Sequence, residues 1–174
     1  MTKYGFGDLD TFERMKCSLP FCLFCLIGLF SCRQDDVRLE KLDLQPQGLP
    51  LTILAPDSAE VQAKDYAFMR DITIRKGDNF FIQIFEFEAS NLDAAGEKLK
   101  QLTSVKEDPF FKELITEEDQ GFIFSRLQDS TKLNYDFRYV KILGLKELIF
   151  QTGLVGSFSL EDVRRMYKSV SSLQ

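Results

Sequence analysis

The sequence predicts an α+β fold, an α/β/α sandwich in which two helices cover a mainly antiparallel central sheet. Phenylalanine is abundant, with Phe 17 in 174 residues, and aromatic side chains favour half-buried strands. Short segments typical of strands recur between residues 51 and 151, and two segments show helical spacing of apolar residues. One strand is apolar on both faces, which predicts a layer of structure on each side of the sheet.

The chain begins with a segment that does not suit a secretion signal. Several acidic residues lie in residues 1–14, whereas the start of a signal peptide is positively charged. Met15 and Lys16 then precede a long apolar run. We therefore expect translation to start at Met15 and residues 1–14 to be an extension that the native protein lacks.

The apolar run has the length of a signal peptide. No charged residue lies between Lys16 and Arg33. This span is shorter than the about 20 residues that a helix needs to cross a bilayer. It suits the apolar core of a signal peptide, which has about 7–15 residues. A short buried core helix is the alternative, and Pro20 and the polar sequence after the run both weigh against it.

The end of the run, Leu29-Phe30-Ser31-Cys32, resembles the lipobox of bacterial lipoproteins. A lipobox has Leu three residues before an invariant cysteine and a small residue directly before it, although Phe30 is bulkier than the residues common at its position. The resemblance identifies residues 15–31 as a lipoprotein signal peptide and Cys32 as the lipidation site. It implies diacylglycerol and palmitate on Cys32, and two or more acyl chains hold a protein stably on a membrane.

The same resemblance implies a location in the bacterial cell envelope, on the outer membrane. Asp35 and Asp36 behind the cysteine resemble the surface-export signal of some Gram-negative lipoproteins, so the cell surface and the periplasmic face both stay open. Residues 32–48 are charged and end in a segment with Pro and Gly, which predicts an acidic tether. Residues 49–174 are expected to form a single globular domain.

The first half of this domain is predicted to be mainly strands. Residues 51–55 form the first, and residues 59–63 form a second, although Asp57 with Glu60 would also suit a helix cap. Residues 69–75 and 80–87 flank a turn at 76–79 and are expected to form a hairpin. The second hairpin strand has apolar residues on both faces, which indicates a central strand covered on two sides. Its two faces are Phe80, Ile82, Ile84 and Phe81, Phe85, Phe87.

The second half is predicted to contain both helices. A helix over residues 92–106 has Asn91 as its N-cap and an apolar stripe of Leu92, Ala95, Leu99 and Leu102. Four strands follow, at residues 110–115, 121–127, 134–143 and 147–151, and Asp136 and Arg138 are expected to form the wetter face of the third. The last helix, over residues 160–173, has a capping box of Ser159 and Asp162, and Phe158 is expected to pack on Val163.

This order of elements resembles the PsbP/Mog-type fold. The likeness rests on the opening Leu51-Thr52-Ile53-Leu54-Ala55-Pro56, the hairpin through Gly77, the middle helix after Asn91 and the closing helix from Ser159-Leu160-Glu161-Asp162. It covers most of residues 49–173 and concerns the order of elements rather than a diagnostic motif. The best-studied relatives are binding or assembly factors, so the resemblance implies a non-catalytic role.

Composition excludes several classes of function. Lys+Arg 22 against Asp+Glu 27 gives a net charge of -5, which is unsuited to nucleic acid. The chain has no histidine, so it lacks the commonest metal ligand and general base. Its cysteines all lie between Cys17 and Cys32, so the domain has no thiolate site. No cofactor is expected.

Two carboxylate groups are the candidate sites for chemistry. Glu86 and Glu88 would share one face of a strand, about 6.6 Å apart, as an acid/base pair or a calcium site. Glu117, Glu118 and Asp119 form an acidic turn, which lacks the spacing of an EF-hand. Solvated charged residues on a strand end and in a hairpin turn are the simpler interpretation of both groups.

Three other features carry less specific signals. Residues 153–156, Gly-Leu-Val-Gly, are interpreted as a turn rather than an anion-binding loop. Ser58, Ser125 and Ser130 have no histidine partner, so no nucleophile stands out. Phe110 and Phe111 should face opposite ways on a strand, and an uncovered one would suit a partner surface, although burial on both sides explains them equally.

The sequence therefore predicts a lipid-anchored envelope lipoprotein whose domain binds a protein or another envelope component without catalysis. The alternative is an envelope hydrolase or a calcium-dependent module that uses the carboxylates named above. A small-ligand carrier is a third possibility and requires an apolar cavity between helix and sheet.

Overall fold

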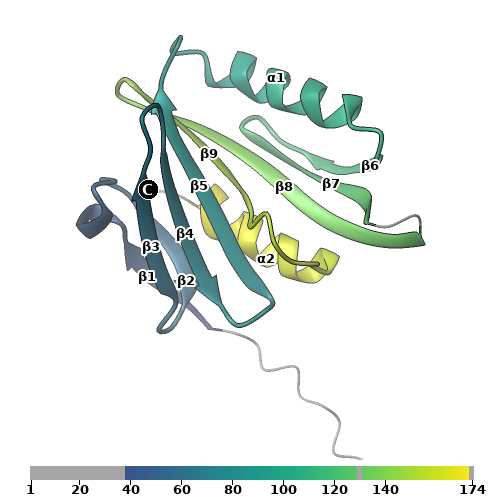
Figure 1. Cartoon of the computed structure of the whole chain (residues 1–174), viewed down its shortest axis with the longest axis horizontal. Helices are drawn as coiled ribbons and strands as arrows, with labels where there is room; N and C mark the ends of the chain where they lie inside the picture. Colours follow the sequence, from purple (N-terminus) through teal and green to yellow (C-terminus); the bar gives the residue numbers. More distant parts are fainter. Residues whose placement is uncertain (1–37, 129–130, 173–174) are drawn as a thin grey trace, which may run out of the picture. The chain divides into compact units, whose positions relative to one another are not determined.

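The computed structural model describes residues 38–128 and 131–172. These residues form an α+β fold with a seven-stranded antiparallel sheet, a two-stranded sheet and two α-helices (Figure 1). The large sheet has the order β3-β4-β5-β9-β8-β7-β6, so its two halves along the chain meet where β5 pairs with β9. The strands and helices, in chain order, are β1 Leu39–Asp43, β2 Thr52–Pro56, β3 Glu60–Asp65, β4 Arg70–Lys76, β5 Phe80–Glu88, α1 Ala94–Glu107, β6 Phe111–Glu117, β7 Gly121–Gln128, β8 Lys132–Leu143, β9 Lys146–Thr152 and α2 Leu160–Ser171.

One face of the large sheet is covered by α2 together with the two-stranded sheet. The predicted capping box is confirmed, since the Asp162 N–H donates to Ser159 Oγ and the Ser159 N–H donates to the Asp162 carboxylate, both at 3.2 Å. The predicted apolar stripe is buried through Val163, Met166, Tyr167 and Val170. Burial of this stripe against the sheet stabilises the helix far more than its intrinsic propensity does.

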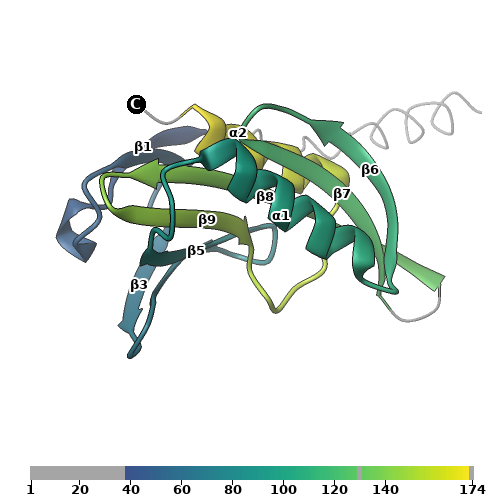
Figure 2. The same ribbon diagram turned by 90° about the horizontal axis from the view of Figure 1, so that it is seen from above.

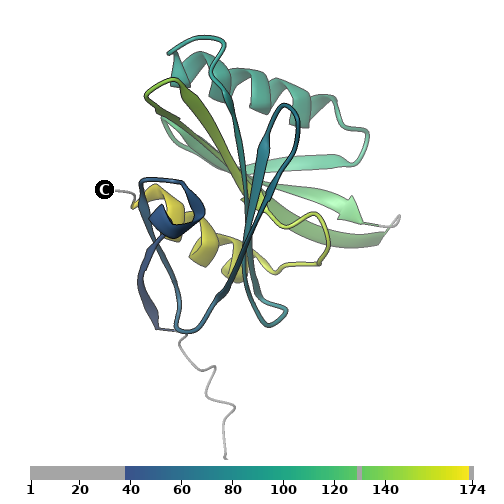
Figure 3. The same ribbon diagram turned by 60° about the vertical axis from the view of Figure 1, so that its left-hand side comes forward.

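The opposite face is covered by α1, so the two helices lie on either side of the large sheet (Figure 3). Leu102 and Val105 pack against Phe122 and Phe124 of β7 in a small separate core. The predicted apolar stripe was wrong at its start, because Leu92 and Leu99 are 67% and 59% exposed.

The helix begins later than predicted, at Ala94, and its N-cap is Asp93 rather than Asn91. Asp93 Oδ1 accepts a hydrogen bond from the Gly96 N–H at 3.0 Å. Glu97, which is 8% exposed, lies on the buried side of the helix. The helix therefore rests on few apolar contacts.

The central strand β5 pairs along both edges, with β4 and with β9, as predicted. Its first face is fully covered, because Phe80, Ile82 and Ile84 are buried in the main core. Its second face is covered only in part, since Phe81, Phe85 and Phe87 are half-buried. The reason is that α1 packs on β6 and β8 and leaves the other half of this face without a helix.

Two further segments differ from the sequence prediction. The described part of the predicted tether is folded: Leu39–Asp43 pairs with β2, and Leu44 is fully buried. The leucines of this segment alternate irregularly with charged residues, so the sequence did not show a regular strand pattern. The predicted wetter face of β8 is also wrong, because Asp136 is 2% exposed and forms hydrogen bonds inside the protein. The strand interpretation of residues 59–63 is confirmed by β3.

Candidate functional site

An open pocket of about 630 Å³ lies at the end of the large sheet where β5 finishes and β9 begins. The hairpin turn between β3 and β4, residues 66–69, forms its outer wall. We call it the hairpin pocket. Its lining residues are Asp65, Tyr66, Ala67, Phe68, Met69, Arg70, Glu86, Phe87, Glu88 and Lys146.

Glu86 is the most deeply placed acidic group of the hairpin pocket. Its side chain is 11% exposed, and its Oε1 lies 3.5 Å from Lys146 Nζ. Its other oxygen, Oε2, is buried without a hydrogen-bond partner among the described residues. A buried acceptor left unpaired costs about 1–3 kcal/mol, so this oxygen is a position where a donor from a ligand would be favourable.

Two cations border this carboxylate. Arg70 lies opposite Glu86 in the β4–β5 pairing, and Lys146 lies opposite Glu88 in the β5–β9 pairing. Arg70 Nε donates to Asp65 Oδ1 at 2.5 Å, and this hydrogen bond raises the pKa of the guanidinium. Arg70 also donates to the Gln47 carbonyl at 3.2 Å. The hydrogen bonds of Arg70 thus go to other partners, so Lys146 forms the direct ion pair with Glu86 while Arg70 acts on it through its charge alone.

The rim of the hairpin pocket is aromatic and exposed. Tyr66 and Phe68 are 51% and 75% exposed, and Leu145, in the turn next to Lys146, is 78% exposed. Large apolar side chains at the tip of a hairpin have no structural need to be there, because they bury little surface in the folded chain. Exposed aromatic residues beside a pocket are typical of protein-binding surfaces.

The predicted carboxylate pair is brought to this pocket. Glu86 and Glu88 lie on one face of β5 and both line the cavity, although Glu88 is exposed. Among residues 38–128 and 131–172, no group of three or more possible ligands is placed to hold a metal ion. The geometry thus provides a paired carboxylate and a solvated one rather than two equivalent acids.

The predicted acidic turn lies elsewhere, between β6 and β7. Glu117 Oε1 lies 2.6 Å from Lys98 Nζ, and this contact lowers the pKa of the carboxyl group. Glu118 Oε2 accepts a hydrogen bond of 3.0 Å from the Tyr167 hydroxyl, whose pKa is raised mainly by burial and then by this bond. Asp119 is exposed beside them. Two of the three carboxylates therefore hold α1 and α2 to this turn.

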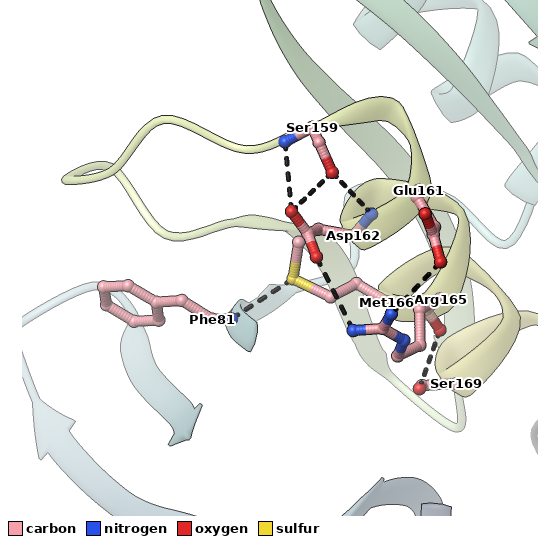
Figure 4. Close-up of polar contacts among 7 residues, drawn as sticks. All are labelled: Phe81, Ser159, Glu161, Asp162, Arg165, Met166 and Ser169. Carbon is pink, nitrogen blue, oxygen red and sulfur yellow. Dashed lines mark hydrogen bonds and ion pairs between the residues drawn. The ribbon is translucent and has the colours of Figure 1, made fainter. Parts of the chain in front are cut away.

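The N-terminus of α2 is capped by its own side chains. Ser159 Oγ accepts from the Asp162 N–H, the Asp162 carboxylate accepts from the Ser159 N–H, and Arg165 Nη1 lies 3.5 Å from Asp162 (Figure 4). Gly153 approaches Phe81 so closely that a side chain there would overlap the ring, while its N–H donates to the Phe81 carbonyl at 2.8 Å. The predicted turn is thus tightly packed at Gly153, whereas Leu154 and Val155 after it are exposed.

The predicted aromatic pair does face opposite ways. Phe111 is half-buried, with its ring centroid 6.5 Å from that of Phe124, whereas Phe110 is 55% exposed. Phe110 lines a second pocket of about 400 Å³ with Leu154 and Val155, at the end of the sheet opposite the hairpin pocket. It is a smaller pocket that Arg126, Gln128 and Asn134 also line.

The predicted serines are not assembled into a site. Ser58 lies in the turn between β2 and β3 with a φ of 55°, and Ser125 is fully buried with an unpaired hydroxyl. Ser130 and Cys32 lie outside the described residues. In the described part of the chain, neither helix is long and apolar enough to cross a membrane.

Sequence reasoning missed four contributors to the hairpin pocket: Tyr66, Phe68, Arg70 and Lys146. The signal that could have revealed the first two is local, because aromatic residues in a short turn between charged strands are unusual. The two cations gave no such signal, since their proximity to Glu86 depends on strand pairing. Comparisons with known protein families, with curated proteins and with solved structures find no match to this chain.

Proposed function

We propose that this chain is a lipid-anchored lipoprotein of the bacterial outer membrane, whose domain is a non-catalytic binding or assembly module. The Leu29-Phe30-Ser31-Cys32 sequence supports the anchor, through acyl chains on Cys32. The order of strands and helices supports a fold of the PsbP/Mog type. The observation that carries the binding role is the hairpin pocket, in which an exposed aromatic rim surrounds a carboxylate oxygen without a partner.

The pocket is suited to a protein segment that combines an apolar side chain with a basic one. Tyr66 and Phe68 offer apolar surface that binding would remove from water. Glu86 Oε2 would accept a hydrogen bond from a Lys or Arg side chain of the partner, and such charge-assisted bonds are about twice as strong as neutral ones. The lining has a mild excess of acidic groups, which also favours a positively charged partner.

Site-specific photocrosslinking tests this proposal in intact cells that express the full chain. A photoreactive phenylalanine at position 68 should give a discrete adduct with one envelope protein. The same probe at Leu99, which is similarly exposed on α1, is the matched control and should give none. Equal adducts from both positions, or no adduct from position 68, would contradict a binding role for the hairpin pocket.

A second measurement separates the contribution of the aromatic rim to partner binding from that of the Glu86 charge. Phe68→Ser should abolish the adduct formed by a probe at Tyr66, and Glu86→Gln should weaken it, because the neutral amide loses the charge-assisted bond. Both variants should keep the thermal stability of the parent within a few degrees, since Phe68 is exposed and Glu86 makes only one long ion pair. Full crosslinking in both variants would place the partner elsewhere.

A further inference from the structure

Strand β3 forms one edge of the seven-stranded sheet, and β6 forms the other (Figure 2). Within the described residues, no strand pairs with the outer side of β3. All six residues of β3 pair with β4 in continuous register, so this edge is regular. The pairing of β6 is instead interrupted by two register shifts, which disturb an edge and discourage further pairing.

The hydrogen-bond pattern defines which groups of β3 face outward. The Tyr66 N–H donates to the Met69 carbonyl at 2.8 Å, so the backbone N–H of Tyr66 points toward the β4 side of the hairpin. In an antiparallel ladder, hydrogen-bonded and non-hydrogen-bonded residue pairs alternate. The backbone groups of the even-numbered residues of β3 therefore form hydrogen bonds with β4. The N–H and C=O groups of Val61, Ala63 and Asp65 therefore point away from the sheet.

Two opposite charges lie on this edge. Glu60 and Lys64 are exposed and form no ion pair with any described residue. They lie four residues apart, about 13 Å along the strand, so they do not neutralise each other. Both are on the sheet face opposite Val61 and Ala63, because side chains alternate along a strand.

We propose that β3 pairs with β3 of a second copy of this chain, antiparallel and centred on Gln62. This register places Val61 opposite Ala63 of the second copy, so the outward N–H and C=O groups of both strands meet. It also places Glu60 opposite Lys64 of the second copy, twice by symmetry. Outward-facing residues such as Val61 and Ala63 are two positions apart along β3. They can therefore meet outward-facing residues of the second copy only in registers that differ by two residues.

The neighbouring registers lose this complementarity. A shift of one step in one direction places Glu60 opposite Tyr66, and a shift in the other direction places Glu60 opposite Gln62. Only the register centred on Gln62 satisfies the backbone groups and joins both charge pairs. The same surface patch is used by both copies, as a two-fold interface requires. The result is one continuous sheet through two domains.

A charge swap tests this pairing in the purified full chain in detergent, with molecular mass measured by light scattering over a range of concentrations. The parent should form a dimer. Glu60→Lys and Lys64→Glu should each weaken the dimer by about tenfold or more, because each places two like pairs across the interface. The double variant E60K/K64E should restore it, since the signs are exchanged and the register is kept.

Engineered disulfides provide an independent measurement. Gln62→Cys should give a reducible dimer, because the two Gln62 positions face each other across the two-fold axis. Lys112→Cys, exposed on the other edge strand β6, is the matched control and should not. The parent chain reports the background from its own cysteines.

A parent that stays monomeric at all concentrations, a double variant that fails to restore the dimer, or equal crosslinking at positions 62 and 112 would overturn the proposal. A Gln62→Cys adduct with a different protein would also overturn it. The substituted residues Glu60, Gln62, Lys64 and Lys112 do not line the hairpin pocket, although Asp65 at the end of β3 does.

Discussion

The Asp136 carboxylate of β8 accepts a hydrogen bond of 2.6 Å from the hydroxyl of Thr152, the last residue of β9. The same oxygen accepts from the Thr152 N–H at 3.1 Å and from the Phe137 N–H at 2.7 Å. The other oxygen accepts from Arg138 Nη1 at 3.0 Å. Both oxygens of this buried charge therefore accept hydrogen bonds, and the carboxylate joins β8 to the point where the chain leaves the sheet for α2.

Thr152→Val should lower the free energy of unfolding by about 1.5–3 kcal/mol, because a hydrogen bond to a buried charged group is lost without a change in side-chain volume. Urea unfolding followed by circular dichroism measures this difference. Thr103→Val, on the exposed side of α1, is the matched control and should change stability by less than about 0.5 kcal/mol. Equal effects of the two substitutions on the free energy of unfolding would show that the Asp136–Thr152 hydrogen bond does not stabilise the fold.

Glu147→Gln should make the protein more stable at neutral pH. Burial raises the pKa of Glu147, and the charge of Glu97 on α1 raises it further, against the opposing effect of Lys100. The folded state therefore binds the proton more tightly than the unfolded chain does. The resulting stabilisation is fully present below the unfolded pKa of about 4.3 and is lost as the pH rises through the folded pKa.

The uncharged amide removes this pH dependence. The stability gained by Glu147→Gln should be larger at pH 7 than at pH 4, as measured by urea unfolding at both values. Glu113→Gln, exposed on β6, should show no such difference. A gain from Glu147→Gln that is the same at both pH values would mean that the carboxyl group does not titrate differently on folding.

Glu86→Gln distinguishes the binding role from the alternative of a calcium-dependent module or a hydrolase. If the protein binds without metal, millimolar calcium should leave the melting temperature of the parent and of Glu86→Gln unchanged, measured by differential scanning fluorimetry. Glu113→Gln, an exposed carboxylate of β6 outside both candidate groups, is the matched control. A rise of several degrees in the parent that is lost in Glu86→Gln would support the calcium-dependent alternative and overturn the binding proposal.

Cys32→Ala should leave an unlipidated precursor, because in the proposed anchor the diacylglycerol is attached to the sulfur of this residue. Metabolic labelling with a clickable palmitate analogue, followed by electrophoresis, measures both the label and the size of the product. Cys25→Ala, in the apolar part of the predicted signal peptide, should be labelled and processed like the parent. Normal labelling of Cys32→Ala would refute the anchor.

Local patterns predicted most of the elements but misjudged what they bury. The alternation in residues 80–87 and the Ser159–Asp162 capping box correspond to β5 and to the start of α2. These signals come from residues close in sequence, so the sequence alone contains them. Asp136 was expected on a wet face because its side chain is charged, yet neighbouring strands supply the donors that make its burial possible.

The candidate site was predicted only in part, for the same reason. Glu86 and Glu88 were expected to share a face, which follows from alternation along one strand. The positions of Arg70 and Lys146 beside them depend on the pairing of β5 with β4 and β9, which no single segment specifies. The aromatic rim at Tyr66 and Phe68 likewise becomes part of a pocket only when the hairpin lies next to β5.

By itself, the sequence determined the α+β class, the order of strands and helices from β2 onward, the hairpin at Gly77 and the start of α2, because periodicity, turn residues and caps act over a few neighbouring positions. Only the tertiary structure decided which half of the sheet α1 covers, which carboxylates are buried, and that a pocket forms around Glu86. Those outcomes depend on contacts between segments distant in the chain, whose free energy exists only once the sheet is assembled.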